Sequence, residues 1–98
     1  MQEITYHIGK YGRMRKQYLQ NHRKGLFAIL LTSGKLHFHL AEIDQTANER
    51  MELIIRQTAE SERVTEQLKA ENQMLWVQKM NNIRNRAEES ILNELIYS

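Results

Sequence analysis

The chain has 98 residues, of which 41% are hydrophobic and 27% are charged, and it contains neither cysteine nor proline. This length allows a single domain with a modest core, which we expect to span residues 1–98. The absence of cysteine excludes disulfides and thiolate zinc sites, so a reducing cytoplasm is the expected compartment. No apolar run in the sequence reaches the ~18 residues that a membrane-spanning helix needs, so we expect no membrane partner.

The net charge of +2 conceals an uneven distribution along the chain. Residues 1–39 carry seven Lys and Arg against one acidic residue, whereas residues 40–98 carry seven against eleven. A basic first third on an acidic body is typical of a protein that presents a surface to a polyanion. The alternative is that the basic third docks onto the acidic body of the same or a second subunit.

The first residues are predicted to form a short strand followed by a basic helix. Ile4, Tyr6 and Ile8 alternate with polar residues, which is the pattern of a β-strand. Residues 11–23 then place apolar side chains along one side at helical spacing and basic ones along the other.

A short apolar segment and a turn follow the basic helix. Residues 26–31 are predicted to be mostly buried, after a kink at Gly25. The sequence Thr-Ser-Gly at 32–34 is expected to end this segment and reverse the chain, because glycine suits the left-handed residue beyond a helix end.

Two long helices are predicted to make up the rest of the chain. One runs from Lys35 to about Glu60, and the other from Thr65 to Tyr97, a stretch with no glycine or proline to interrupt it. At 1.5 Å per residue they would be ~39 Å and ~50 Å long. Residues 61–64 are the expected break between them, so the two helices should form an antiparallel hairpin.

The second long helix has a clear apolar stripe. Thr65 is a good N-cap for it. Asn72 lies on the stripe, where we expect a buried polar residue that fixes the register of helix pairing. The apolar positions are Leu68, Trp76, Met80, Ile83, Ala87, Ile91 and Leu95.

These elements predict an all-α fold with a short strand at its start. Residues 1–34 form the basic amino-terminal part, and residues 35–98 form the helical hairpin. Two helices of this length leave an apolar face that one short helix cannot cover. We therefore expect a homodimer in which two hairpins complete a four-helix bundle.

The basic side of the helix at 11–23 is the candidate site for nucleic acid. Phosphate recognition needs Lys or Arg on one accessible face, and a helix fits the major groove of duplex DNA. Tyr11, Tyr18 and His22 are placed to add phosphate hydrogen bonds or base stacking. The alternative is a solvated charged face that binds nothing. The candidate nucleic-acid-binding residues are Lys10, Arg13, Arg15, Lys16, Gln20, Arg23 and Lys24.

No set of catalytic or metal-binding residues can be assembled from the sequence. It offers no nucleophile with a matching base, no paired-carboxylate site and no glycine-rich phosphate loop, so we expect no enzymatic activity. On a helix, His37 and His39 would point ~200° apart and could not share one ion. We expect neither a metal nor another cofactor.

Several runs of the sequence resemble the TnpV family of small transposon-encoded proteins. These runs cover most of the chain from Tyr11 onward, and the most specific is VTEQLKAENQM followed by W and MNNIR. The runs are YGRMRKQYLQNHRK at 11–24, LLTSGKLHFHLAEIDQ at 30–45, VTEQLKAENQMLWVQKMNNIRNRAEE at 64–89 and LNELIYS at 92–98.

The resemblance implies a bacterial mobile element that carries this gene beside a site-specific recombinase. Members of the family have been likened to excisionases, small basic proteins that bind and bend DNA to favour excision. The resemblance thus implies an excisionase-like accessory factor that binds duplex DNA, with the recombinase of the same element as a partner. The alternative is a helical module that binds the recombinase or another element-encoded protein without touching DNA.

Overall fold

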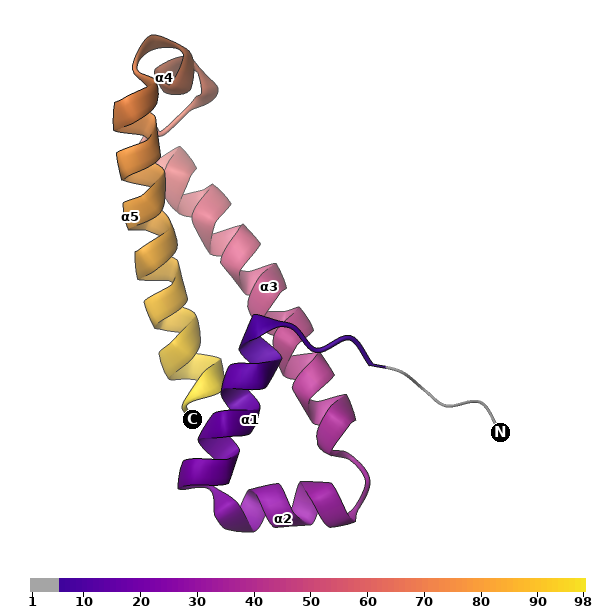
Figure 1. Ribbon diagram of the computed structural model, residues 1–98. Coiled ribbons are helices and arrows are strands. Elements are labelled where there is room, and N and C mark those ends of the chain that lie inside the picture. Colours follow the sequence, from indigo (N-terminus) through magenta and orange to yellow (C-terminus); the bar gives the residue numbers. More distant parts are fainter. Residues whose placement is uncertain (1–5) are drawn as a thin grey trace.

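The structure, a computed structural model, describes residues 6–98, and every regular element among them is helical. Helices hold 84% of these residues and strands hold none, so the predicted all-α class is confirmed. Figure 1 shows two long helices, α3 and α5, with α1 packed near one end of the pair and α2 crossing below it. The elements are α1 (Lys10–His22), α2 (Lys24–Thr32), α3 (Leu36–Ser61), α4 (Glu66–Glu71), α5 (Gln73–Ile91) and a short π-helical stretch, η1 (Leu92–Ile96).

Before α1, residues 6–9 form no regular element. Ile4 lies outside the described residues, so the short amino-terminal strand stays a prediction. Ile8 packs against a buried cluster of Leu19, Leu36 and Leu40, which joins α1 to the first turns of α3.

Helix α1 is fixed to α3 at its amino-terminal end by a contact that the sequence did not suggest. Its N-cap residue, Gly9, offers no side chain to the free amides of the first turn. The carboxylate of Asp44 on α3 takes that role, because its Oδ1 accepts a hydrogen bond from the backbone amide of Gly12 at 3.0 Å. The helices lie so close that a Cβ on Gly12 would sit 2.5 Å from Ile8 Cγ2 and 3.0 Å from the carbonyl oxygen of Leu40.

Helix α2 differs from its prediction in two ways. The chain breaks at Arg23 and not at Gly25, which lies inside the helix with open space around it. The segment 26–31 is also not buried, because Ile29 and Leu31 are 64% and 55% exposed. A helix with apolar residues all round its surface can bury only the face that meets its one neighbouring layer. Gly34 has a φ of +74° and ends α2 as predicted.

Helices α3 and α5 run in opposite directions; they are close together toward α4 and splay apart toward the other end, where α1 contacts both (Figure 1). The expected helix at 35–60 is confirmed as α3. Arg50 in the middle of α3 contacts Glu94 on η1 at 2.6 Å, and Arg86 on α5 contacts Glu62, the residue that follows α3, at 2.7 Å. The core between α3 and α5 also takes residues from the amino-terminal part of the chain. Its fully packed members are Tyr11, Ala47, Ile91 and Ile96.

The single helix predicted from Thr65 to Tyr97 is wrong, because the chain breaks at Asn72. Thr65 does cap the first piece, α4, by accepting from the amide of Leu68 at 3.3 Å. Asn72 is exposed and not buried, and its Oδ1 accepts from the amide of Leu75 at 3.2 Å, which makes it the N-cap of α5. An asparagine side chain competes for backbone amides in this way, and here that preference decides the local structure.

Within residues 6–98, no helix is both long enough and apolar enough to cross a membrane. The described chain measures 54 × 32 × 18 Å, and its shortest dimension corresponds to about two helix diameters. The homodimer stays a prediction.

Candidate nucleic-acid interface

The outward side of α1 carries a row of basic residues that we call the basic stripe. Arg13, Lys16, Gln20 and Arg23 follow one another at steps of three, four and three residues, which keeps them on one side of a helix. Lys24 extends the row onto the first residue of α2. All five side chains are exposed, whereas the opposite side of α1 is buried through Tyr11 and Leu19. The structure therefore brings together five of the seven predicted site residues.

None of the four cations in the basic stripe forms an ion pair with another residue in the range 6–98.

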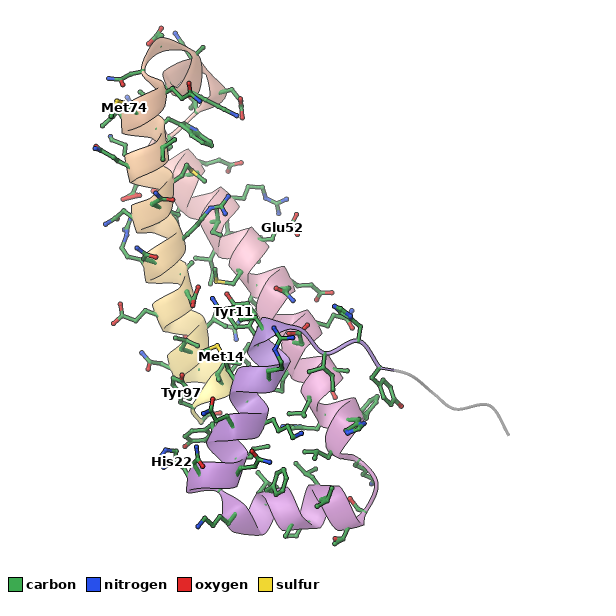
Figure 2. The ribbon with its side chains drawn as sticks, in the orientation of Figure 1. Tyr11, Met14, His22, Glu52, Met74 and Tyr97 are labelled. Atoms are coloured by element: carbon green, nitrogen blue, oxygen red, sulfur yellow. The ribbon has the colours of Figure 1, made fainter. Side chains whose placement is uncertain are left out.

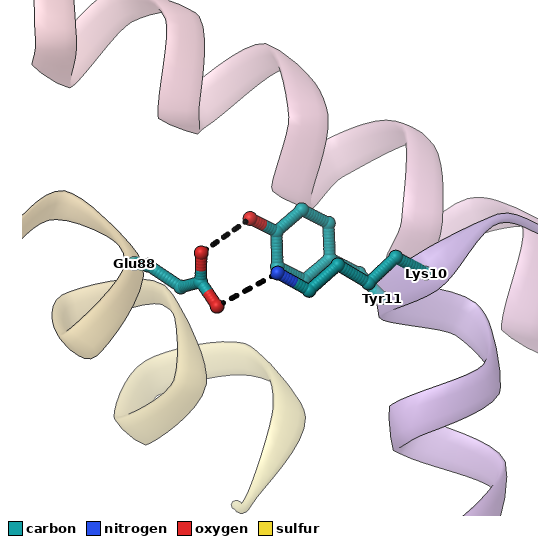
Figure 3. Close-up of polar contacts among 3 residues, drawn as sticks. All are labelled: Lys10, Tyr11 and Glu88. Atoms are coloured by element: carbon teal, nitrogen blue, oxygen red, sulfur yellow. Dashed lines mark hydrogen bonds and ion pairs between the residues drawn. The ribbon is translucent and has the colours of Figure 1, made fainter. Parts of the chain in front are cut away.

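Lys10 is held differently from the stripe. Its Nζ lies 2.9 Å from Oε1 of Glu88 on α5, and the hydroxyl of Tyr11 donates to Oε2 of the same carboxylate at 3.4 Å (Figure 3). The hydrogen bond to Glu88 raises the pKa of Lys10, and burial raises the pKa of the Tyr11 phenol. This contact fixes α1 to α5, and it corrects the prediction that Tyr11 is available to a ligand, since that residue is 7% exposed.

Arg15 was predicted as a nucleic-acid contact, and the structure contradicts this. The residue is 6% exposed, and its Nη1 donates to the carbonyl oxygens of Ile96 at 2.9 Å and Ser98 at 2.8 Å. Its Nε donates to Nε2 of His39 at 3.4 Å. At 100° per residue, position 15 falls on the same side as Tyr11 and Leu19, so its long side chain is directed into the protein. Arg15 holds the end of the chain against α1 and α3.

Burial also lowers the pKa values of Arg15 and His39. The Arg15 guanidinium nevertheless stays charged at neutral pH. Burial first, and then the neighbouring Arg15, lower the pKa of His39. Among the described residues no group of three His, Cys, Asp or Glu side chains is arranged to hold a metal ion.

A cluster of aromatic rings borders the basic stripe across the exposed surface of α1. The Tyr18 ring lies 5.3 Å from that of His22 and 5.4 Å from that of Tyr97. Figure 2 shows Met14, His22 and Tyr97 along one side of α1, where they line a pocket of about 350 Å³ with Gln17 and Asn21. Tyr18 and His22 were predicted beside the basic residues. Tyr97 was not, because only the fold brings the far end of the chain to α1.

Together these features define, over residues 6–98, a small helical fold with a basic helix face that has no acidic partner in that range, next to an aromatic pocket. The chain belongs to the family described as transposon-encoded protein TnpV, whose sequence model matches residues 1–96. The resemblance found in the sequence is thus confirmed, and the protein is transposon-encoded. Searches of curated proteins and of solved structures matched nothing.

Proposed function

We propose that this protein binds duplex DNA through the basic stripe of α1, as an excisionase-like accessory factor beside the recombinase of its element. The observation that carries the proposal is the absence of acidic partners for Arg13, Lys16, Arg23 and Lys24 within residues 6–98. Phosphates are the ligands that such a row of exposed cations favours, because each contact releases a counterion from the DNA.

Two other cations of the basic third, Lys10 and Arg15, make contacts within residues 6–98 that the stripe does not make. Docking of the basic third onto the acidic body is the alternative explanation for the uneven charge. Lys10 and Arg15 do serve that purpose, because they bind Glu88 and the carbonyl oxygens of the last residues. The cations of the stripe are exposed, and among residues 6–98 they make no such contact. Docking therefore explains two of the seven basic residues in the first third and leaves five, the four cations of the stripe and Lys35.

The dimensions of α1 also suit the major groove. A helix of 13 residues is ~20 Å long, and the groove is ~12 Å wide, enough to admit it. Gln17 and Asn21 are exposed between the basic stripe and the aromatic pocket. Amide side chains of this kind pair with adenine edges, so α1 presents groups for bases beside groups for phosphates.

Binding to labelled duplex from the ends of the element, compared with random duplex, tests the proposal. The double variant Arg13→Gln/Lys16→Gln should bind both duplexes more weakly than the wild type. The matched control Lys35→Gln/Lys79→Gln removes the same charge from exposed positions off α1 and should bind like the wild type. Equal losses in the two variants would show that net charge matters and that the stripe does not. Unchanged binding by the stripe variant would reject this interface.

A second candidate function, a protein-binding module, is favoured by two exposed apolar residues of α2, Ile29 and Leu31. Leu31 lines a pocket with Tyr6, whose ring forms an edge-to-face pair with that of Phe38 at a centroid distance of 6.0 Å. Ile29, two residues earlier, projects from the other side of α2. In this proposal the partner is the recombinase of the same element. Ile29→Gln/Leu31→Gln should then lose binding to the purified recombinase and keep its DNA binding, whereas Met74→Gln, exposed at the other end, should keep both. Recombinase binding that survives the double substitution would exclude these two residues as the contact.

A further inference from the structure

A groove on the paired helices α3 and α5 lies on the same side as α1. Ile55 is 11 residues, or about three turns, beyond Asp44, which binds α1, so both lie on one side of α3. On α5, Arg84 precedes Glu88, the residue that binds Lys10, by four residues. Helix α1 therefore covers this side of α3 and α5 at the end around Asp44 and Glu88. The groove occupies the stretch of the same side that continues toward α4.

The floor of this groove is apolar and only partly covered. Its volume is about 500 Å³, and its floor is formed by half-buried side chains from both long helices. Val77, which is 41% exposed, lies on the adjacent flank of α5. The floor residues are Ile55, Ala59, Trp76 and Met80.

Four charged residues line the groove, and their signs alternate around it. Toward the α1 end lie Glu52 on α3 and Arg84 on α5. Toward the α4 end lie Arg56 on α3 and Glu66 on α4. All four are exposed, and none forms an ion pair with any described residue. A fifth charge, Lys69 on α4, lies over the Trp76 ring, with its Nζ 4.7 Å from the ring centroid.

This pattern is complementary to itself. When a second copy is turned over about a two-fold axis that lies in the interface and crosses the long helices, the two ends of the groove exchange. Glu52 of each copy then faces Arg56 of the other, and Arg84 faces Glu66. A partner of uniform charge would meet repulsion from two of these four residues, whereas an isologous copy meets an opposite charge at all four. The same rotation places the two α1 helices at opposite ends, so they do not collide.

We propose that this groove is the contact surface of a homodimer, in which α3 and α5 of two copies form a four-helix bundle beyond α1. The uncovered stretch, from Gln73 to Arg84 on α5, is ~18 Å long and two helices wide. That is less than the ~800 Å² per partner of a standard interface, so association in the micromolar range is expected. The inference does not depend on DNA binding.

Charge exchange at two exposed positions of α3 tests the proposal. Light scattering should give the mass of two chains for the wild type between ~10 and ~100 µM, concentrations at which a dimer with a micromolar Kd predominates. Arg56→Glu alone and Glu52→Arg alone should each give the mass of one chain, because like charges then face one another. An equimolar mixture of the two variants should dimerise again. The control Glu60→Arg, exposed on α3 outside the groove, should dimerise like the wild type.

Far-UV circular dichroism checks that each variant is as helical as the wild type. The double exchange Glu52→Arg/Arg56→Glu in one chain restores opposite charges across the two-fold axis and should also dimerise, which keeps the test decisive if a single variant misfolds. A monomeric wild type, single variants that remain dimeric, or a mixture or double exchange that stays monomeric would each overturn the proposal. The emission of Trp76 should shift to shorter wavelength in the dimeric samples alone, since the dimer covers its ring.

Discussion

The contact between Asp44 and the first turn of α1 should be a main source of stability in this small fold. Asp44→Ala removes the acceptor of the Gly12 amide, which is buried between α1 and α3. Loss of an N-cap costs ~1 kcal/mol, and a buried amide without an acceptor costs ~1–3 kcal/mol. These two figures describe overlapping effects, so we expect a loss of ~2 kcal/mol in the free energy of unfolding. For a chain of this size that corresponds to a fall of ~10 °C in Tm.

Urea unfolding followed by circular dichroism at one fixed protein concentration measures this loss. Asp44→Asn is the matched variant, because it keeps an oxygen acceptor for the Gly12 amide and removes the charge that favours the positive end of α1, together with the 3.3 Å hydrogen bond that Oδ2 accepts from Asn48. It should lose ~1 kcal/mol or less. Hydrogen exchange of the Gly12 amide reports the same contact directly and should become much faster in Asp44→Ala alone. An alanine variant that keeps the wild-type Tm and a protected Gly12 amide would refute the capping role.

Three further predictions concern titration and the break in the last helix. The free energy of unfolding should fall as pH rises above ~10, because the folded state raises the pKa of the Tyr11 phenol and so favours its neutral form. In urea titrations, Tyr11→Phe should remove this part of the fall. The free energy of unfolding should also fall as pH drops below ~6.5, since the folded state favours neutral His39, whose pKa is lowered. His39→Gln should be less sensitive to acid, and an identical acid profile would contradict this. Asn72→Ala should cost ~1 kcal/mol by thermal unfolding and Asn72→Asp very little, because aspartate also caps α5.

The parts of the fold predicted from sequence are those with a local cause. The alternation of apolar and polar residues along 11–23 and 35–60 repeats with the helical period, so α1 and α3 follow from it directly. Gly34 marked the turn because a left-handed backbone favours glycine. The exposed cations of the stripe likewise follow from their spacing on one helix.

The predictions that failed are those in which a local sequence pattern competed with a second interaction. Asn72 fits the apolar stripe by position, yet capping of the Leu75 amide is stronger than the preference for one unbroken helix. Leu31 is apolar, but α2 has only one layer to pack against, so its hydrophobicity did not imply burial.

The role of Arg15 depends on residues that are distant in the sequence. Its partners, the carbonyl oxygens of Ile96 and Ser98, lie more than 80 positions away and meet it only in the folded chain. Tyr97 and Tyr18 are likewise brought together only by the fold, and so are Asp44 and Gly12. The spacing of charged and apolar residues in the sequence identifies the helix and its faces. Tertiary contacts decide which of its cations are bound within the fold.

The salt dependence of DNA binding tests the central claim, that the basic stripe meets phosphates, most directly. Each phosphate neutralised adds ~0.9 to the slope of log K against log salt, so four cations should contribute ~3.6. Binding of one duplex measured by fluorescence anisotropy over a range of salt concentrations gives this slope for the wild type and for Arg13→Gln/Lys16→Gln. The account predicts weaker binding by the variant and a slope lower by ~2, because two contacts are lost. Equal affinities with equal slopes would contradict it and would leave the stripe as a solvated face.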